Sequence, residues 1–438
     1  MTHASSTRRL ALLATLAASV VLASCGGGGG GGSGSGTAQI RAVNLTVDTP
    51  SLDVVIGGNR QFSAQAVGAL AAYVGLDANT YTVNVNATGN TSVLLTNPYT
   101  LAKDTNYTAV VWGNQSNMRL STLSENEAAP TTATNHKLRF FNATTDAGSL
   151  DVYLTPVAAE LTNPTLAALT PTQLVTREIP ASSYRLRITG TGDPSDLRLD
   201  VPLVTLAANQ ISTLVITSGS GGVLVNGTLI LQQGALTAAN NTQARLRVVA
   251  SVNSAGTVAM SVGGNTVAAG LRSPSLQSYA LVPAGSVNVT ARVNGNVVSS
   301  TTRSLLAGSD YTLLMLGAPA TANLVVLTDD NRLPASGTRA KVRMVNGIFG
   351  SDPLTLTVDN SPVSSDVPAG MASAYTLTPS TTTAPVQVSS PSTGILFQST
   401  SLVPVPLSGQ TVYSMFMLAG ATDTAGNQVA TGVMRKDR

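Results

Sequence analysis

Apolar and polar residues alternate along short stretches through most of the chain, and turn-forming residues follow these stretches. The segment 257–262 is the clearest example, because Val and Met alternate there with Thr, Ala and Ser before Gly263-Gly264. A period of two that ends at a Gly-Gly turn predicts a half-buried strand of a β-hairpin. A second such stretch, 287–293, ends at Asn294-Gly295, and Asn-Gly is the strongest short hairpin signal. The pattern therefore predicts an all-β chain.

A short motif, an arginine between apolar residues, recurs at intervals of about 100 residues. A second apolar stretch follows each copy at the same spacing, which argues for one repeated unit. A period near 100 is longer than that of solenoid repeats, so each copy is expected to be a domain with its own core. With about six to eight short strands each, the domains are predicted to be tandem antiparallel β-sandwiches of Ig-like type. Their expected bounds are 38–136, 137–243, 244–339 and 340–438.

The repeated arginines are the most regular polar feature of the chain. They are Arg41, Arg139, Arg247 and Arg343. These side chains could line a shared ligand face. Alternatively they are structural, and each points outward from the first strand of its repeat or pairs with an acid at a domain end. The structural interpretation is favoured.

The N-terminus carries an export signal. Arg8-Arg9 precede the apolar run 10–23, which is too short to cross a hydrocarbon core of about 30 Å as a helix. The following motif, Leu22-Ala23-Ser24-Cys25, resembles the lipobox of bacterial lipoprotein precursors. The resemblance implies a signal peptide at 1–24 and lipidation of Cys25. An ordinary secretory signal, a buried N-terminal helix and a twin-arginine signal remain the alternatives.

Glycine and serine follow the predicted anchor. The segment 25–37 is expected to be the acylated cysteine and a flexible tether, because glycine-rich sequence has no side chains to bury and much backbone entropy to lose. Glycine rather than aspartate after the cysteine resembles the pattern of proteobacterial lipoproteins sent to the outer membrane. The expected location is therefore the bacterial cell envelope, lipid-anchored at the outer membrane, with the periplasmic or surface face left open.

Composition removes several classes of function. One cysteine allows no intramolecular disulfide. The formal charge of +3 falls to about +1 once Arg8 and Arg9 leave with the leader. With little net charge and 4% aromatic residues, the chain is not expected to bind nucleic acid.

The sequence contains few side chains suited to catalysis. His136 is the one histidine beyond the leader, so Ser-His-Asp and Cys-His catalysis and His-based zinc sites are excluded. We predict no catalytic, cofactor-binding or metal-binding residues, and no cofactor. The acids fall mainly in predicted turns, where they are expected to be solvated: Glu125, Glu127, Asp193, Asp196, Asp329 and Asp330.

One metal hypothesis stays open. Glu125-Asn126-Glu127 and Asp329-Asp330-Asn331 follow the last predicted strand of the first and third repeats. Oxygen-rich linkers between tandem sandwiches can bind Ca²⁺. The second repeat has Gln232-Gln233 at this place, and no helix-loop-helix calcium motif exists in the chain.

Several motifs together resemble a known family. The opening Arg-Val strand that ends in Asn, the later Leu150-Asp151-Val152-Tyr153, and Tyr279 to Gly285 resemble a domain-of-unknown-function family of bacterial envelope and secreted proteins. Its members open R-V-x-N/H-A-S-x-D-A-P-x-V-D-V-Y. Asp53 and Asp151 keep the aspartate of that pattern, whereas Ala259 and Thr355 replace it. The resemblance implies a fold and a location, and no active site.

Two classes of function follow from these observations. The first is a lipid-anchored, non-catalytic envelope protein that acts as a spacer or binds a protein or glycan partner. The second is a cryptic carboxylate-dependent enzyme acting on cell-wall or extracellular polysaccharide, which needs converging carboxylates in a pocket. Trp112 could stack on a sugar, although a lone tryptophan in an alternating strand is more often part of a core.

The anchor can be tested with one substitution. Cys25→Ser removes the thiol that would carry the lipid, so the variant should accumulate as soluble or unprocessed precursor. Membrane and soluble fractions of expressing cells, compared by immunoblot, measure this outcome. An unchanged membrane fraction would show that Cys25 is not the anchor.

Overall fold

The computed structural model describes residues 36–399, 405–424 and 428–438. Gly36–Arg438 forms one compact unit, and it contains all the strands described below. Cys25 and the predicted lipobox and tether up to residue 35 lie outside the described residues. Within the described part, no helix is long and apolar enough to cross a membrane.

The first repeat consists of two four-stranded sheets. Their orders are β4-β1-β7-β8 and β3-β2-β5-β6. The strands are β1 (Thr37–Thr46), β2 (Ser51–Ile56), β3 (Asn59–Ala66), β4 (Val74–Asp77), β5 (Thr80–Ala87), β6 (Val93–Thr100), β7 (Asn106–Asn114) and β8 (Asn117–Ser124).

The second repeat has the same plan with one additional strand. Its sheets are β12-β9-β15-β16-β17 and β11-β10-β13-β14. The strands are β9 (Asn135–Ala143), β10 (Leu150–Thr155), β11 (Leu166–Leu169), β12 (Leu174–Pro180), β13 (Ser182–Gly190), β14 (Asp193–Leu206), β15 (Ile211–Ser218), β16 (Val225–Leu231) and β17 (Leu236–Ala239).

In the third repeat, β18 pairs on one side with two short strands, β21 and β22. The sheets are β21-β18-β25-β26, with β22 also on β18, and β20-β19-β23-β24. The elements are β18 (Gln243–Val252), β19 (Thr257–Val262), β20 (Asn265–Arg272), β21 (Ser275–Leu276), β22 (Ala280–Pro283), β23 (Gly285–Val293), β24 (Asn296–Leu305), β25 (Asp310–Gly317), the short 3₁₀ helix η1 (Pro319–Thr321) and β26 (Asn323–Asp329).

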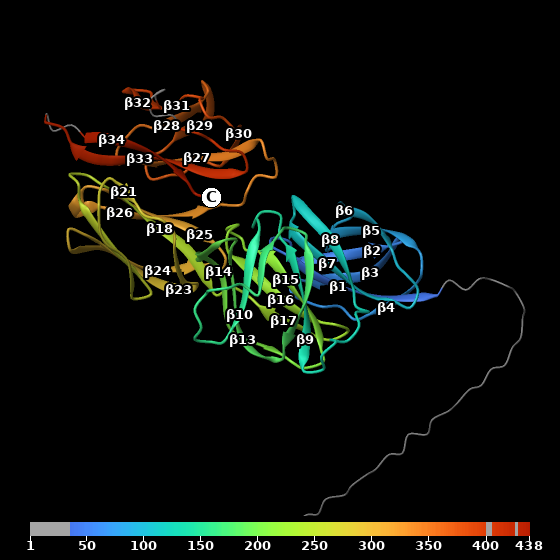
Figure 1. Ribbon diagram of the computed structural model, residues 1–438. Coiled ribbons are helices and arrows are strands. Elements are labelled where there is room, and N and C mark those ends of the chain that lie inside the picture. The colour runs from blue at the N-terminus through green and yellow to red at the C-terminus, as the bar shows by residue number, and fades with distance from the viewer. Residues whose placement is uncertain (1–35, 400–404, 425–427) are drawn as a thin grey trace, which may run out of the picture. The chain divides into compact units, whose positions relative to one another are not determined.

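The fourth repeat returns to two four-stranded sheets, β30-β27-β33-β34 and β29-β28-β31-β32. Its strands are β27 (Arg339–Gly347), β28 (Leu354–Val358), β29 (Ser361–Val367), β30 (Thr376–Pro379), β31 (Val386–Ser390), β32 (Gly394–Gln398), β33 (Thr411–Thr422) and β34 (Gln428–Lys436). In every repeat we call the sheet that contains the first strand the inner sheet and the other one the outer sheet (Figure 1).

Each repeat buries a core between its inner and outer sheets. In the third repeat, Leu246 and Leu313 of the inner sheet pack with Met260 and Val289 of the outer sheet, and each is at most 2% exposed. The predicted alternation is visible in β19, whose Val258, Met260 and Val262 are buried between less buried neighbours. The predicted all-β fold of tandem β-sandwiches is confirmed.

One part of that prediction needs correction, because the sandwiches are not antiparallel throughout. The first strand of each repeat runs parallel to a later strand at the centre of the inner sheet: β1 with β7, β9 with β15, β18 with β25 and β27 with β33. A parallel pair needs a long crossover, and the strands of the outer sheet provide it. Alternation shows which residues are buried but not the direction of the neighbouring strand.

The repeats are joined in pairs through their inner sheets. Val43 and Trp112 of the first repeat share an apolar cluster with Phe141 and Val215 of the second. Leu314 of the third repeat shares another cluster with Phe416 of the fourth. An inner sheet is therefore covered on both faces, by its own outer sheet and by the inner sheet of its partner. We call repeats one and two the first pair, and repeats three and four the second pair.

The first pair should depend strongly on Trp112. Its side chain is 1% exposed and meets Phe141 edge to face at 6.1 Å between ring centroids. Trp112→Ala should lower the free energy of unfolding by about 3–5 kcal/mol, as expected for a large cavity in a core. Urea denaturation measures the change.

The matched control is Val93→Ala, where the side chain is 49% exposed and the change should stay within about 0.5 kcal/mol. Equal effects of the two substitutions would contradict the paired arrangement.

Candidate functional site: an arginine network between the repeats

The four repeated arginines occupy one register position in the fold. Each lies in the first strand of its repeat, opposite a hydroxyl residue of the parallel partner strand. The four residue pairs are Arg41 with Thr108, Arg139 with Thr213, Arg247 with Thr312 and Arg343 with Ser414. In three repeats the Nε atom donates to that hydroxyl, at 2.9, 2.9 and 3.0 Å for Arg41, Arg247 and Arg343. Nε of Arg139 has no partner.

All four side chains are buried, with at most 5% of each residue exposed. Burial follows from the paired arrangement, since these side chains leave the sheet on the side covered by the partner repeat. The predicted pairing with an acid at a domain end is confirmed for Arg41, Arg247 and Arg343. The acids are Glu125 and Asp329, the residues that directly follow or end the last strand.

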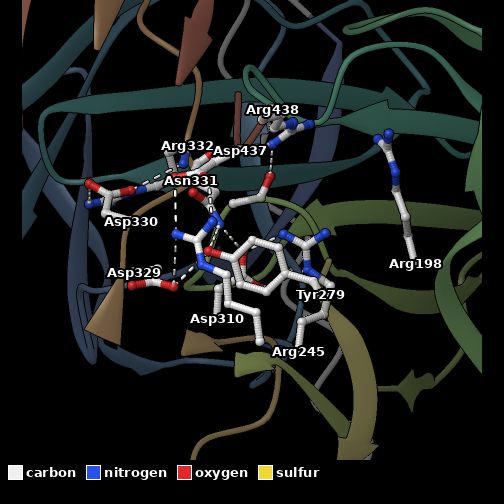
Figure 2. A network of polar contacts seen from close by, with 12 residues as sticks. Arg198, Arg245, Tyr279, Asp310, Asp329, Asp330, Asn331, Arg332, Asp437 and Arg438 are labelled. Carbon is white, nitrogen blue, oxygen red and sulfur yellow. Dashed lines mark hydrogen bonds and ion pairs between the residues drawn. The ribbon is translucent and has the colours of Figure 1, made fainter. Parts of the chain in front are cut away.

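The second pair contains a nearly reciprocal network (Figure 2). Arg343 of the fourth repeat binds Asp329, which ends the third repeat, and Arg247 of the third repeat binds Asp437, which ends the fourth. Arg247 also lies 3.7 Å from Asp329. Because each arginine reaches the terminal acid of its partner, the two repeats neutralise each other's buried charge.

Hydroxyl groups and aromatic rings complete this network. Asp329 accepts hydrogen bonds from Thr312 Oγ1 and from the hydroxyl of Tyr279, both at 2.6 Å. The guanidinium of Arg247 lies 4.6 Å from the ring centre of Tyr279, and that of Arg343 lies 4.7 Å from the ring centre of Tyr375. A cation over an aromatic face is stabilised by the ring quadrupole.

The first pair is less symmetrical. Arg41 Nη2 binds Glu125 at 2.6 Å and also donates to the carbonyl of Leu231 in the second repeat at 3.1 Å. Arg139 donates to the carbonyl of Ser124 at 2.6 Å and lies 4.0 Å from Glu127. The second repeat has Gln232 where the others have an acid, and the backbone N–H of the next residue, Gln233, donates to Glu125 at 3.0 Å. In the first pair Glu125 is therefore the one buried carboxylate that binds a repeated arginine, whereas the second pair has two such carboxylates, Asp329 and Asp437.

The protonation states in the second pair follow from burial and charge. Burial alone opposes ionisation of Asp329, but Arg343 and Arg247 outweigh it, so the pKa of this carboxyl lies below its ordinary value. Burial, followed by the charge of Asp329, raises the pKa of Tyr279 well above its ordinary value. Asp329 is therefore an ionised acceptor and Tyr279 a neutral donor. The groups neutralise one another, which suits a structural network.

The network extends toward the second repeat. Arg245 forms a two-pronged ion pair with Asp310, at 2.9 and 2.6 Å, and Asn331 donates to the same carboxylate at 2.7 Å. Asp330 binds both Arg332 and Lys341 at 2.8 Å. Despite its burial, hydrogen bonds from these two cations lower the pKa of Asp330 to about 2.

A glycine loop of the second repeat, Gly219–Gly222, packs against the third. The N–H of Gly221 donates to the carbonyl of Gly308 at 2.8 Å, and its own carbonyl accepts from the N–H of Asn331 at 3.0 Å. A Cβ at Gly222 would lie 2.5 Å from the backbone nitrogen of Arg332, and Gly222 has a φ of 89°. Only glycine satisfies both the positive φ and the close approach. This loop and the network connect the two pairs.

The other acids highlighted in the sequence also have partners. Asp196 binds Arg198 at 2.5 Å, and Asp193 accepts from Ser195 N–H at 2.9 Å. The expectation that the six acids are solvated is wrong for Glu125 and Asp329, which are 4% and 1% exposed. Arginine beside these two carboxylates disfavours Ca²⁺ there. No cluster of three or more His, Cys, Asp or Glu residues suited to a metal occurs among the described residues.

His136 and Trp112 have structural surroundings. His136 is 2% exposed, its Nδ1 lies 2.9 Å from the carbonyl of Ala207, and burial lowers its pKa. Trp112 belongs to the apolar contact between the first two repeats. The sugar-stacking alternative for Trp112 is therefore wrong, because a ring that is 1% exposed offers no face to a ligand.

Sequence reasoning missed Asp437, Tyr279 and Tyr375. Asp437 stands just after the last strand of the fourth repeat, as Glu125 does in the first. This shared position after the last strand was the signal in the sequence that could have identified Asp437. The tyrosines also had a signal, because Tyr279 and Tyr375 each stand 32 residues after the arginine of their repeat, as Tyr73 does after Arg41 in the first repeat.

The geometry defines a protein of tandem β-sandwiches that are joined in pairs by apolar contacts between inner sheets and, in the second pair, also by buried ion pairs. Comparison with family models identifies the domain of unknown function DUF4397 at residues 38–153 and 244–347, together about half of the chain. The chain belongs to this family. Each match covers the first repeat of a pair and continues through the opening strand of the second repeat, the first match as far as β10.

Other comparisons add little. No curated protein matches the chain. A crystal structure of a "putative cell adhesion protein" from Bacteroides uniformis is 13% identical, with a TM-score of 0.20, over 46% of this chain and 99% of that one. The Bacillus anthracis TIE protein is 8% identical, with a TM-score of 0.15, over 85% of this chain and 66% of that one. Similarities this low support no argument about function.

Removing one arginine of the network should lower the stability of the chain. Arg343→Ala leaves the buried Asp329 without its closest cation and should cost about 3–5 kcal/mol of stability, as measured by chemical denaturation. The double variant Arg343→Met/Asp329→Leu should lose less, because neither charge remains buried and unpaired.

Arg303→Ala is the control, since Arg303 is exposed and forms no ion pair within the described residues. Its effect should stay within about 0.5 kcal/mol. A similar loss in Arg303→Ala and Arg343→Ala would contradict the assigned role of the network.

Proposed function

We propose that this chain is a lipid-anchored, non-catalytic protein of the bacterial cell envelope that serves as a stiff spacer and interaction module. One observation carries the proposal: buried ion pairs, Arg247 with Asp437 and Arg343 with Asp329, join one repeat to the next. A domain array with flexible linkers would not need buried ion pairs between its members.

The junction between the two pairs supports stiffness. Besides the Gly219–Gly222 loop, the hydroxyls of Ser220 and Ser309 lie 2.6 Å apart, and Arg438 donates to the carbonyl of Gly222. Backbone hydrogen bonds in a close-packed junction resist hinge motion more than a few exposed side-chain contacts do. A stiff array holds its far end at a fixed distance from an anchor.

The anchor part of the proposal is supported by the sequence. Leu22-Ala23-Ser24-Cys25 would place a lipid at the start of a glycine-rich tether. More than one acyl chain is needed for stable anchoring, which lipoprotein processing supplies. The outer membrane is the proposed location because glycine follows the cysteine.

No observation favours the polysaccharide-degrading alternative. Glycosidase chemistry requires two carboxyl groups that face each other across an accessible cleft. Each of the six acids named in the sequence has a cation, hydroxyl or N–H partner, and the two most buried ones bind arginine. A glycan or protein partner, if bound, would meet exposed faces of the outer sheets.

Stiffness can be measured by pulsed electron spin resonance between two spin labels. The chain from Gly36 onward has no native cysteine and keeps every described strand and core. Leu203→Cys in the second repeat and Val297→Cys in the third give exposed label sites, at 61% and 49% exposure. We expect one narrow distance distribution.

Two glycine variants provide the comparison. Gly222→Val should broaden the distribution, because its side chain would overlap Arg332. Gly192→Val introduces the same side chain at a positive φ of 74° with nothing within 4 Å, so it should leave the distribution narrow. A broad distribution in the unmodified chain would refute the stiff spacer.

A further inference from the structure

One place in the contact between the first two repeats is not filled by side chains. A hollow of about 410 Å³ lies there. It is lined by Leu45 and Val67 of the first repeat, by Thr217 and Thr228 of the second, and by Ala307 of the third. Small-molecule sites in proteins have volumes of about 300–1,000 Å³. The hollow is therefore large enough for a small organic ligand.

A change at one register position of the second repeat leaves this space. Four residues after the hydroxyl residue that lies opposite the repeated arginine, the parallel strand carries a large apolar side chain in three repeats. These residues are Trp112, Leu316 and Leu418, and each is at most 3% exposed. The second repeat has Thr217 at this position. Because threonine is smaller than tryptophan or leucine, space remains where the other repeats pack.

The corresponding place in the second pair is closed. Ser251 of the third repeat stands where the first repeat has Leu45, four residues after the repeated arginine. Its hydroxyl donates to the carbonyl of Gly347 at 2.7 Å and accepts from the N–H of Ala419 at 2.6 Å. The paired arrangement therefore does not require a hollow here, and the hollow is a feature of the first pair.

The additional strand of the second repeat forms one wall of the hollow. Leu236 and Ala238 of β17 line it, together with Asn240 directly after this strand. In the described residues, the inner sheets of the other repeats end at the strand that corresponds to β16. Both the space and this wall are thus specific to the second repeat.

Two buried hydroxyl groups at the hollow lack a partner. Thr217 and Thr228 lie on the same face of the adjacent strands β15 and β16, and they are 6% and 5% exposed. Neither hydroxyl has a hydrogen-bond partner among the described residues. Beside them, Asn226 accepts from the N–H of Asn241 at 2.9 Å, which leaves its amide nitrogen for a ligand. Since buried polar groups are normally hydrogen-bonded, these groups call for a polar occupant.

The lining also restricts the charge of that occupant. None of the described residues that line the hollow is charged or aromatic. A charged ligand would lose its water without gaining an opposite charge, and an apolar ligand would leave the two hydroxyls unpaired. Threonine and asparagine side chains both donate and accept hydrogen bonds, as the hydroxyl groups of a sugar do. The lining therefore favours a neutral ligand rich in hydroxyl groups.

We propose that this hollow binds a small neutral saccharide through Thr217, Thr228 and Asn226. The proposal goes beyond the spacer function, and it depends neither on the lipid anchor nor on the outer sheets, where a larger partner would bind. Ser220 of the Gly219–Gly222 loop and Ala307 also line the hollow, so the bound sugar would contact both sides of the junction between the two pairs. A single sugar ring of about 12 non-hydrogen atoms should bind with a dissociation constant in roughly the millimolar range.

Nuclear magnetic resonance of leucine, valine and threonine methyl groups tests the proposal on the chain from Gly36 onward. The probes are glucose, galactose, mannose and N-acetylglucosamine. At least one of them should shift the methyl signals of Leu45, Val67 and Leu236 together, and the shifts should saturate with a dissociation constant of about 1–10 mM. Glucuronate, which adds a carboxylate to the glucose ring, should bind several-fold more weakly than the best neutral sugar.

Two variants of the hollow separate its hydroxyls from its volume. Thr217→Val/Thr228→Val removes both hydroxyls with little change of shape and should raise the dissociation constant about tenfold. Thr217→Leu introduces the residue that the third and fourth repeats carry at this position. The larger side chain should fill the hollow and abolish the shifts. Circular dichroism melting checks the fold of each variant.

The matched control is Thr237→Val. Thr237 is an exposed residue of β17 that does not line the hollow, so this variant should bind the sugar as the unmodified chain does.

Three results would overturn the proposal. The first is the absence of saturable shifts with every neutral sugar up to about 100 mM, which would mean that the hollow holds water only. The second is equal binding of glucuronate and the best neutral sugar. The third is unchanged binding in a folded Thr217→Val/Thr228→Val variant, which would place the sugar elsewhere on the chain.

Discussion

The structure depends on the burial of one guanidinium in each inner sheet. An arginine that leaves the sheet opposite its own core would normally remain in water, since removing an unpaired charge from water is far more costly than any packing it gains. Here the partner repeat covers the side chain and supplies carbonyls or a carboxylate, as Leu231 does for Arg41 and Asp437 does for Arg247. Apolar residues such as Phe416 then pack around the neutralised groups. A repeat without its partner would expose both the apolar face and the charge.

The sequence predicted the sandwiches well because alternation and turns are local. It also located the arginines and, in Glu125, Glu127 and Asp329, three of their four acidic partners. It could not show that these residues meet, since that depends on which faces of neighbouring repeats pack together. A calcium linker remained an open hypothesis for the same carboxylates until the arginines were placed beside them. The parallel central strands were unpredictable for a similar reason, because strand direction is set by the crossover and leaves the alternation unchanged.

Charge is distributed through this chain in an unusual way. Many of its few ionised side chains lie at the repeat junctions. There the single carboxylate of Asp330 contacts both Arg332 and Lys341. Most of the outer surfaces consist of Ser, Thr and Asn, as in the hydroxyl pairs Thr80–Thr100 and Ser183–Thr205. Such surfaces keep exposed sheet edges soluble without strong fields.

The reciprocal contacts of the second pair also constrain the ancestry of the array. A single sandwich added to or lost from the gene would leave one arginine without its counterpart and one apolar sheet face uncovered. Loss or gain of a whole pair would leave the junction inside every remaining pair intact. The positions of the two family matches, each at the start of a pair, agree with a duplicated segment of two sandwiches. Genes built on this plan should therefore change in length by steps of about 200 codons, twice the repeat period.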